Sequence, residues 1–592
     1  MDEVSTKDEK QLSGIAVSSG SACGKTFVIK RSKTQIPSYE ITSSQVDGEI
    51  RRFEQAIMKT RTDIDALKYE LSQKIGDEEA AIFDAHLLVL EDVAIINETY
   101  SRLRASLRNV ESCYLEVIER FVAAFEQIDD PFMRERVADI RDVARRVLNN
   151  LMGYEERNSM TLGEPSILVS TDFTPSDFAV VDKTKVLGIV TEKGSYTSHT
   201  AILARSLRVP CVVGVAVEAA DIQSGTEILV DGYKGHVFLN PSEAVLKKYT
   251  EIASIHREIE EIFDTSLPFP SETTDGHRVD LCLNIGSAGD MPDSAAIFSD
   301  GVGLFRTENI FLDMDSFPEE EEQFEAYKAA VLKMNGKPTT IRTLDLGGDK
   351  IMPSFFNEYS KNEDNPFMGY RAIRFCLDHV DVFMAQLKAI LRASAFGPVK
   401  ILYPMISGIN ELIRANDLLE QAKLALKNEG RDFDENVKVG VMIEVPSAAM
   451  IIDILARHCD FLSIGTNDLI QYLLAVDRVN DHVAHLYNPA NPAVIRMLKK
   501  IVSDGKKAGL EVSVCGEIAA DPIFAILLIG FGVDSLSMSQ GALSEIKFIL
   551  RKVGSEWLEK IADEALMQNC SRDILTVLRR YRNEIIKKYI KI

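Results

Sequence analysis

The sequence predicts an α/β multidomain protein whose C-terminal half is a (β/α)8 TIM barrel, and three observations support this fold class. First, 592 residues are too many for one hydrophobic core, because a domain commonly holds about 150 residues. Second, the N-terminal half changes from β-type runs to long amphipathic helices and back. Third, the C-terminal half alternates eight β-type runs with helical patterns, which is the strand count of such a barrel.

The composition, 46% hydrophobic and 27% charged, is typical of a folded globular chain. The formal net charge of −23 disfavours nucleic acid and anionic membranes as partners. No stretch approaches the roughly 18 apolar residues of a membrane span, and the polar N-terminus lacks the apolar core of a signal peptide. The eight cysteines stand singly without a CxxC pair, which predicts a cytoplasmic protein with neither disulfides nor a zinc site.

The first domain is predicted to be split by an insertion. Residues 1–11 are polar and predict a flexible tail. Short apolar runs with glycine turns follow in 12–42 and return in 154–240, and together they predict one mixed α/β domain. Between them, residues 43–153 carry a helical pattern rich in Glu, Arg, Leu and Ala. This stretch predicts a helical bundle inserted at a surface loop.

Residues 241–268 predict a linker helix between the two halves. Asn240 and Pro241 suit the start of a helix, because Asn caps helices and Pro fits the first turn. Apolar residues then recur along one stripe, and Pro268 and Pro270 end the pattern.

Residues 269–592 predict the barrel. Patterns such as EEEQFEAYKAAVLKM supply helices between its strands. The eight candidate strands are VDLCLNI, GVGLFRTE, TTIRTLDLGG, VKILYPMI, VKVGVMIEVP, FLSIGTNDL, EVSVCGE and SLSMS.

Polar residues fall at the C-terminal ends of these candidate strands, on the rim where barrel active sites lie. Arginines bind phosphate and carboxylate bidentately, and two carboxylates supply hard oxygens that suit Mg²⁺. The pattern therefore predicts a site for a small phosphorylated acid with a divalent metal. The rim residues are Arg306, Arg342, Asp345, Glu444, Asn467, Asp468 and Cys515. Taken singly, such an arginine can be a structural ion pair, such a carboxylate a helix cap and such a cysteine a packing residue.

A second candidate site lies in KGSYTSHTAILARSL, residues 193–207. Thr197 or Ser198 can cap a helix that begins at about His199. The free N–H groups and the dipole at a helix start favour an anion, including a phosphoryl group on imidazole. They also disfavour imidazolium, which leaves one ring nitrogen as a nucleophile. A surface capping histidine is the alternative.

Several longer motifs give the chain a resemblance to the Enzyme I family of the bacterial phosphoenolpyruvate:sugar phosphotransferase system. The resemblance extends from Leu12 to beyond Ser539. The motifs that carry it are TSHTAILARS (197–206), GVGLFRTE (301–308), RTLDLGGDK (342–350), NPFMGYRAIR (365–374), LRASAFG (391–397), SIGTNDLIQY (463–472), AVDR (475–478) and CGEIAAD (515–521).

The resemblance implies a role for each matching position. His199 matches the phosphorylated histidine, and Cys515 matches the proton donor, a thiol expected to ionise readily near cations and a metal. Glu444 and Asp468 match the magnesium ligands. The residues that match phosphoenolpyruvate-binding positions are Arg306, Arg342, Asn467, Asp468 and Arg478, with Arg371 and Lys350 as further basic residues nearby. Phe178 and Ser195 depart from the family pattern around the histidine.

The resemblance also implies the activity and the partners. The chain would move the phosphoryl group of phosphoenolpyruvate to His199 and then to the phosphocarrier protein HPr, releasing pyruvate. The α/β domain would carry the phosphohistidine, the helical insertion would dock HPr, and the barrel would form a homodimer. In EEAAIFDAHLLVLED (78–92), an apolar stripe leaves His86, Glu91 and Asp92 on other faces, available to a carrier with basic neighbours around its apolar patch.

Three kinds of alternative function compete with this one. Pyruvate phosphate dikinase and phosphoenolpyruvate synthase share these modules, but need an ATP-binding domain for which the residues before 155 leave no room. A regulatory, nitrogen-type paralogue of Enzyme I usually carries an N-terminal sensor domain, and here few residues precede Leu12. A non-catalytic regulatory scaffold would be favoured by loss of a site residue, and His199, Arg306, Glu444, Asp468 and Cys515 are all present.

Overall fold

The described residues form two compact units, Met1–His256 and Arg257–Ile592. Helix α9 (Glu243–Asp264) crosses from the first unit into the second. The structure is a computed structural model, and it describes residues 9–29, 36–75, 82–126, 131–154, 162–194, 198–207, 209–216, 222–312, 316–347, 365–478, 480 and 482–590.

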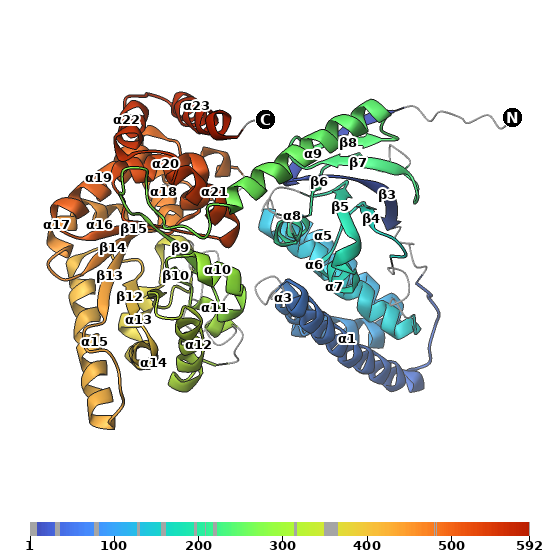
Figure 1. Ribbon diagram of the computed structural model, residues 1–592. Coiled ribbons are helices and arrows are strands. Elements are labelled where there is room, and N and C mark those ends of the chain that lie inside the picture. Colours follow the sequence, from blue (N-terminus) through green and yellow to red (C-terminus); the bar gives the residue numbers. More distant parts are fainter. Residues whose placement is uncertain are drawn as a thin grey trace. The chain divides into compact units, whose positions relative to one another are not determined.

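The first unit contains an eight-stranded sheet of order β1-β8-β7-β3-β4-β5-β6-β2 (Figure 1). Strands β3 to β6 run parallel, whereas β1, β2, β7 and β8 pair antiparallel with their neighbours. The strands are β1 (Lys10–Ser13), β2 (Ile15–Ser18), β3 (Ser21–Ile29), β4 (Ser166–Ser170), β5 (Val186–Thr191), β6 (Cys211–Val213), β7 (Glu227–Asp231) and β8 (His236–Leu239).

The two faces of this sheet pack into different cores, because successive side chains of a strand point to opposite sides. In β4, Ile167 and Val169 join a core made of sheet residues. Leu168 joins a second core, which it shares with the helical insertion and with α7 (Pro175–Val180) and α8 (His199–Ser206).

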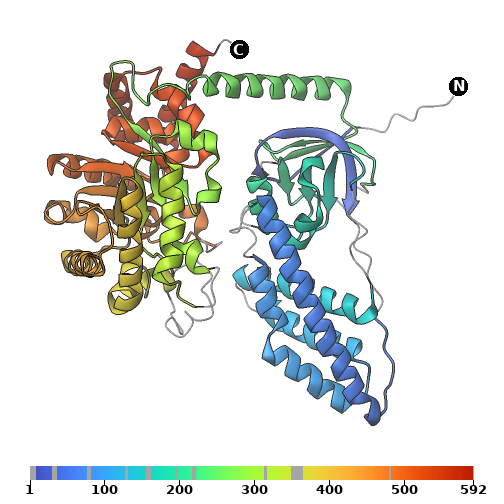
Figure 2. The ribbon, with the colours of Figure 1, turned by 60° about the horizontal axis from the view of Figure 1, so that its bottom comes forward.

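The insertion is a bundle of amphipathic helices whose apolar stripes face one another. In the turned view of Figure 2, its long helices lie side by side, and α1 contacts α6. The short helix α3 packs against both α1 and α6. The helices are α1 (Val46–Ile75), α3 (Ile82–Leu90), α4 (Val93–Ser106), α5 (Val110–Glu126) and α6 (Pro131–Met152).

The prediction of a flexible tail over residues 1–11 is wrong at its C-terminal end. Lys10 and Gln11 belong to β1, which pairs antiparallel with β8. The carboxylate of Glu9 accepts a hydrogen bond from the backbone N–H of Ser242 at 2.7 Å. A polar sequence forms a strand here because β8 offers it an edge with open backbone groups.

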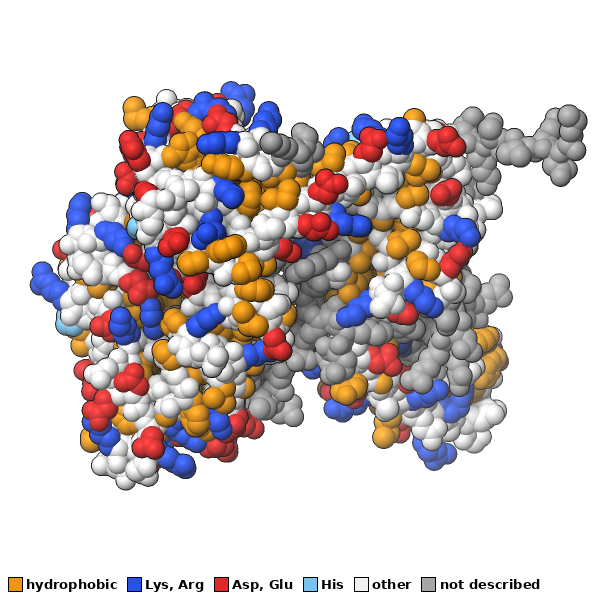
Figure 3. All heavy atoms as spheres, viewed as in Figure 1, with side chains coloured by type: hydrophobic (Ala, Val, Ile, Leu, Met, Phe, Trp, Pro, Cys, Tyr) orange, Lys and Arg blue, Asp and Glu red, His pale blue; other side chains and the backbone are white. Residues whose placement is uncertain are grey.

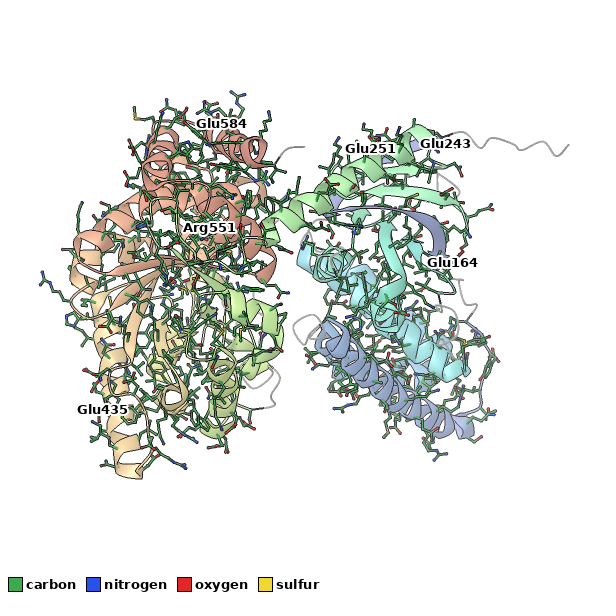
Figure 4. All side chains as sticks on the ribbon, viewed as in Figure 1. Glu164, Glu243, Glu251, Glu435, Arg551 and Glu584 are labelled. Carbon is green, nitrogen blue, oxygen red and sulfur yellow. The ribbon has the colours of Figure 1, made fainter. Side chains whose placement is uncertain are left out.

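Helix α9 begins later than predicted. Asn240 has a positive φ of 46°, so it does not begin the helix, and Pro241 lies outside the first turn. Ser242 takes the cap position instead: its hydroxyl accepts from the N–H of Val245 at 3.4 Å and its carbonyl accepts from Leu246. Glu243 and Glu251, labelled in Figure 4, lie on the exposed side of the helix.

The second unit is a closed barrel of eight parallel strands, which confirms the predicted fold class. Each predicted run contains one of its strands. They are β9 (Asp280–Ile285), β10 (Val302–Phe305), β11 (Thr339–Arg342), β12 (Val399–Tyr403), β13 (Lys438–Ile443), β14 (Phe461–Ile464), β15 (Glu511–Val514) and β16 (Ser535–Met538).

Helices surround the barrel and share its hydrophobic core (Figure 1). They are α10 (Asp293–Phe298), α11 (Glu308–Leu312), α12 (Glu320–Lys333), α13 (Ile373–Asp378), α14 (Val380–Ala393), α15 (Ile409–Glu429), α16 (Pro446–Met450), α17 (Ile452–Leu455), α18 (Thr466–Leu474), α19 (Pro492–Lys507), α20 (Pro522–Phe531), α21 (Gln540–Leu550), α22 (Ser555–Leu566) and α23 (Ser571–Tyr589).

The segment that leads into the barrel is held by Arg551, labelled in Figure 4. Its guanidinium donates to the carbonyl of Pro270 at 2.7 Å and lies 4.8 Å from the centroid of the Phe269 ring. Figure 3 shows acidic and basic side chains interspersed over the visible face of this unit. Among the described residues, no helix is long and apolar enough to cross a membrane.

Candidate active site

The predicted rim residues meet at one end of the barrel, because parallel strands bring their C-terminal ends to the same side. Arg306 follows β10, Arg342 ends β11 and Glu444 follows β13. Asp468 lies in the first turn of α18, after β14, and Cys515 follows β15. Residues far apart in the sequence therefore form one cluster.

Arg342 is the buried centre of the cluster, with a side-chain exposure of 8%. One guanidinium nitrogen pairs with Glu308, and the other lies 2.9 Å from Asp345 Oδ2. Burial alone would lower the pKa of Arg342, but the carboxylates of Glu308 and Asp345 outweigh burial and raise it. The guanidinium of Arg342 is therefore charged, and its ion pairs with Glu308 and Asp345 fix its orientation.

Arg371 pairs with acidic residues that follow two different strands, β11 and β14. Its Nη2 lies 2.8 Å from Asp345 Oδ1 and 3.3 Å from Asp468 Oδ2, and the residue is almost fully buried. Its Nη1 donates to the hydroxyl of Tyr472 at 3.3 Å. Asp468 Oδ1 is buried and accepts no hydrogen bond from the described residues; Arg478 Nη1 lies 3.9 Å from it.

Glu444 and Asp468 form a pair of acidic groups that suits a divalent cation. Glu444 is buried, and its Oε1 accepts from the backbone N–H of Met405 at 2.6 Å. Burial, assisted by the charges of Asp468 and Asp345, raises the pKa of Glu444 to about 8. Two neighbouring carboxylates, one with a buried oxygen that accepts no hydrogen bond from the described residues, fit a cation that would neutralise both. Gly465 is required here, because a Cβ would lie 2.6 Å from Glu444 Oε2.

Cys515 is buried beside this pair of carboxylates. Its sulfur accepts from the Ser463 hydroxyl at 3.3 Å, and its thiol donates to the carbonyl of Ile464 at 3.6 Å. The expectation that this thiol ionises readily includes a bound metal, so it stays a prediction. Burial raises the pKa of Cys515 more than Ser463 and Arg342 lower it, so the thiol keeps its proton at neutral pH.

Three other predicted residues differ in their surroundings. The amide of Asn467 is engaged with Glu517, donating to its carboxylate and accepting from its backbone N–H, both at 3.1 Å. A ligand of Asn467 must share or replace these bonds. Arg306 is exposed on the rim. Lys350 lies outside the described residues.

His199 is the first residue of α8, as predicted to within one residue at each end of the helix. Ser198 is the cap, and its hydroxyl accepts from the N–H of Ala201 at 3.4 Å. The next residue, Thr200, donates its hydroxyl to the carbonyl of Phe173 at 2.9 Å. Phe178 packs edge-on against Phe173, with ring centroids 4.4 Å apart. His199 belongs to the first unit and the rim to the second.

The prediction that His86 is available to a partner is wrong. Its side chain is buried between α3 and α6, with Nε2 3.2 Å from Asp139 Oδ1. The sequence predicts a single buried face for α3, the one that carries the apolar stripe. In the structure α3 packs against both α1 and α6, so a second face, which carries His86, is buried too. Glu91 is exposed and pairs with Arg61, and Asp92 caps α4 by accepting from the N–H of Ala94.

The sequence reasoning did not single out Glu308 and Tyr472, which hold Arg342 and Arg371. Glu308 stands two residues after Arg306, between the apolar runs GVGLF and IFL, and an acid near an arginine in such a place is a usable sign of pairing. No feature of the sequence around Tyr472 indicates its role, because its partner, Arg371, lies far from it in the chain.

Three family descriptions match the chain: "PEP-utilising enzyme, N-terminal" over 13–136, "PEP-utilising enzyme, mobile domain" over 162–235 and "PEP-utilising enzyme, PEP-binding domain" over 263–555. Proteins named phosphoenolpyruvate-protein phosphotransferase match almost the whole chain. That of Staphylococcus carnosus is 38% identical over 97% of this chain and 99% of its own length. That of Listeria monocytogenes is 38% identical (97% and 100%), and that of Haemophilus influenzae 39% (96% and 99%). The chain belongs to the phosphoenolpyruvate-protein phosphotransferase family.

Phosphoenolpyruvate-protein phosphotransferases use a divalent metal. In this chain, Glu444 and Asp468 would hold it, and among the described residues no cluster of three or more His, Cys, Asp or Glu side chains offers another site. Two protein ligands leave room for waters and for a phosphate-bearing substrate.

The raised pKa of Glu444 predicts that metal binding depends on pH. Because its pKa is raised, Glu444 keeps its proton to a higher pH than an ordinary carboxyl group, and the metal must displace that proton. We therefore expect the affinity of the metal-free protein for a divalent metal to rise with pH, with release of a proton where Glu444 is protonated. Calorimetry in two buffers of different ionisation enthalpy measures that proton. Glu444→Gln should release none, and a pH-independent affinity would contradict the prediction.

Proposed function

We propose that the chain transfers the phosphoryl group of phosphoenolpyruvate to His199 and then to HPr, releasing pyruvate, as the first step of the sugar phosphotransferase system. The family membership over 97% of the chain supports this proposal. The observation that carries it is the rim: Arg342 and Arg371, oriented by buried acids, stand beside the Glu444–Asp468 pair. Such a site suits a small, highly anionic phosphorylated acid.

The arginines of the rim bind the phosphate and carboxylate of phosphoenolpyruvate and stabilise negative charge as the phosphoryl group leaves. Positioning and electrostatics of this kind carry most phosphoryl transfers. Glu444 and Asp468 would hold Mg²⁺, which supplies further charge neutralisation when bound. A ring nitrogen of His199 forms the new N–P bond as the P–O bond of phosphoenolpyruvate breaks.

The leaving group is the enolate of pyruvate, and it must gain a proton at carbon. Cys515 supplies that proton and becomes a thiolate, which the Ser463 hydroxyl and Arg342 stabilise. Its raised pKa fits this role, because a donor must hold its proton at neutral pH until the enolate forms.

The role of Cys515 predicts that phosphorylation and pyruvate formation separate in Cys515→Ser. His199 should be labelled at close to the wild-type rate, because the arginines and carboxylates of the rim remain. Enolpyruvate should leave the site and ketonise slowly in solution, so pyruvate appears late. Measuring both products in one reaction checks this, with Cys459→Ser as the control. Pyruvate formed as fast as the label would assign the proton to another group.

The partner expectations belong to the same proposal. The helical insertion docks HPr, and Glu91 and Asp92 complement the basic neighbours of the carrier's apolar patch. Since Asp92 also caps α4, Glu91 is the cleaner position to test. Homodimerisation through the barrel and a cytoplasmic location complete the proposal.

Labelled phosphoenolpyruvate tests the whole proposal. With Mg²⁺ present, the label should pass to the chain, survive base, be lost in acid and then move to HPr. A chain that takes no label is a regulatory scaffold, and a chain that labels without passing phosphate to HPr serves another carrier.

A further inference from the structure

A polar cluster lies buried inside the helical insertion of the first unit. His86 of α3 stands between two aspartates of α6, with Nε2 3.2 Å from Asp139 Oδ1 and Nδ1 3.9 Å from Asp142 Oδ2. All three side chains are at most 7% exposed. Polar groups at such depth cost free energy unless they are paired, so this cluster fixes a specific arrangement of the two helices.

Asp142 extends the cluster out of the insertion and into the α/β domain. Its Oδ2 accepts the hydroxyl hydrogen of Ser176, the second residue of α7, at 2.7 Å. Arg145 and Arg146 of the same helix pair with Asp142 as well. Burial would raise the pKa of Asp142, but Arg146, Arg145 and His86 outweigh it and lower the pKa, so Asp142 is charged.

The segment that holds Ser176 also holds α8. Thr174 caps α7 in a box with Asp177, whose carboxylate accepts from the Thr174 N–H at 2.8 Å. The carbonyl of Phe173, at the start of this segment, accepts the Thr200 hydroxyl beside His199. Two hydrogen bonds, one at each end of Phe173–Ser176, therefore connect α6 to α8.

Among the described residues, the insertion also shares an apolar core with α7 and α8. Apolar contacts are not directional, so they hold the two parts together without fixing their mutual orientation. A hydrogen bond to a charged acceptor is short and directional, and it is stronger than a neutral one. The Ser176–Asp142 bond is thus suited to fix that orientation.

We infer that Asp142 and Ser176 are positioning residues that fix the helical insertion relative to α8, so that a carrier docked on the insertion meets His199 in line. His86 Nδ1 lies 3.9 Å from the same oxygen of Asp142 that accepts from Ser176. The inference rests on the proposed function, since it assumes that HPr docks on the insertion and exchanges phosphate with His199. It concerns the transfer with HPr, because phosphoenolpyruvate is proposed to bind at the rim, which belongs to the other unit.

Ser176→Ala in the full-length protein tests this inference, because it removes one hydrogen bond and little volume. We expect the kcat of phosphate exchange between phospho-HPr and His199 to fall about tenfold, as small errors of alignment are costly. The KM for HPr should change by less than about twofold, because the docking surface is intact. Phosphorylation of His199 by phosphoenolpyruvate should also stay within about twofold.

Thr99→Val is the matched control. It removes a buried hydroxyl within the insertion, which donates at 2.8 Å to the carbonyl of Ile95 in its own helix. Similar thermal stability of the two variants, with the loss of HPr exchange confined to Ser176→Ala, would support the inference. An unchanged exchange rate in Ser176→Ala, or an equal loss in both half-reactions, would overturn it. A wild-type protein that takes no label would instead refute the proposed function.

Discussion

His199→Ala is expected to accept no phosphate from either direction. The imidazole is the only group proposed to form a bond to phosphorus, so its removal leaves no acceptor for phosphoenolpyruvate or for phospho-HPr. The loss should be complete in both half-reactions, whereas the fold should persist, because Ser198 still caps α8. The measurement is the stoichiometry of acid-labile, base-stable label. His458→Ala, an exposed histidine of the barrel unit, should label normally.

Retained label of normal stoichiometry in His199→Ala would move the phosphorylation to another residue. It would also remove the support for α8 as the helix that carries the phosphoryl group. The inference about Asp142 and Ser176 would then be wrong as well.

The second large effect separates the two half-reactions. Arg306→Ala, Arg342→Ala, Glu444→Ala and Asp468→Ala should each slow phosphorylation by phosphoenolpyruvate by about a thousandfold. Reverse transfer from phospho-HPr to His199 should remain nearly intact, because that reaction uses residues of the first unit. Rates of both half-reactions, measured on the same preparations, check the division.

The four variants differ in how cleanly they test this. Arg342→Ala removes one ion-pair partner from each of the buried carboxylates of Glu308 and Asp345, and breaking a buried pair costs about 3–5 kcal/mol of stability in comparable cases. Arg371 still pairs with Asp345. Arg306 is exposed, so its removal perturbs the fold least. Arg278→Ala, an exposed arginine just before β9, is the matched control and should leave both rates unchanged. Equal damage to both half-reactions in Arg306→Ala would contradict the division of labour.

The sequence was sufficient to predict the barrel and its rim. Strands such as β13 are short buried runs with distinctive apolar composition, and their polar ends stand out against it. Arg342 and Glu444 could be recognised because a charged residue directly after such a run has few places to point except the rim.

What the sequence did not predict depends on partners far along the chain. The burial of His86 follows from α6 lying against a second face of α3, which no local periodicity reports. The raised pKa of Cys515 follows from the depth of its site and not from the charges near it in the sequence. Ser242 caps α9 in place of the predicted Asn240, because the positive φ at Asn240 turns the chain before the helix starts.

Strand β1 has a consequence for handling the protein. It is the outermost strand of the sheet, only four residues long, and it covers the backbone edge of β8, where Val237, Phe238 and Leu239 lie. Short, charged edge strands of this kind protect a sheet from pairing with another molecule. Proteolysis or trimming beyond Ser13 would uncover the apolar edge of β8. We expect the trimmed protein to self-associate by pairing of the exposed β8 strands. An affinity tag placed before Glu9 would leave β1 in place over this edge.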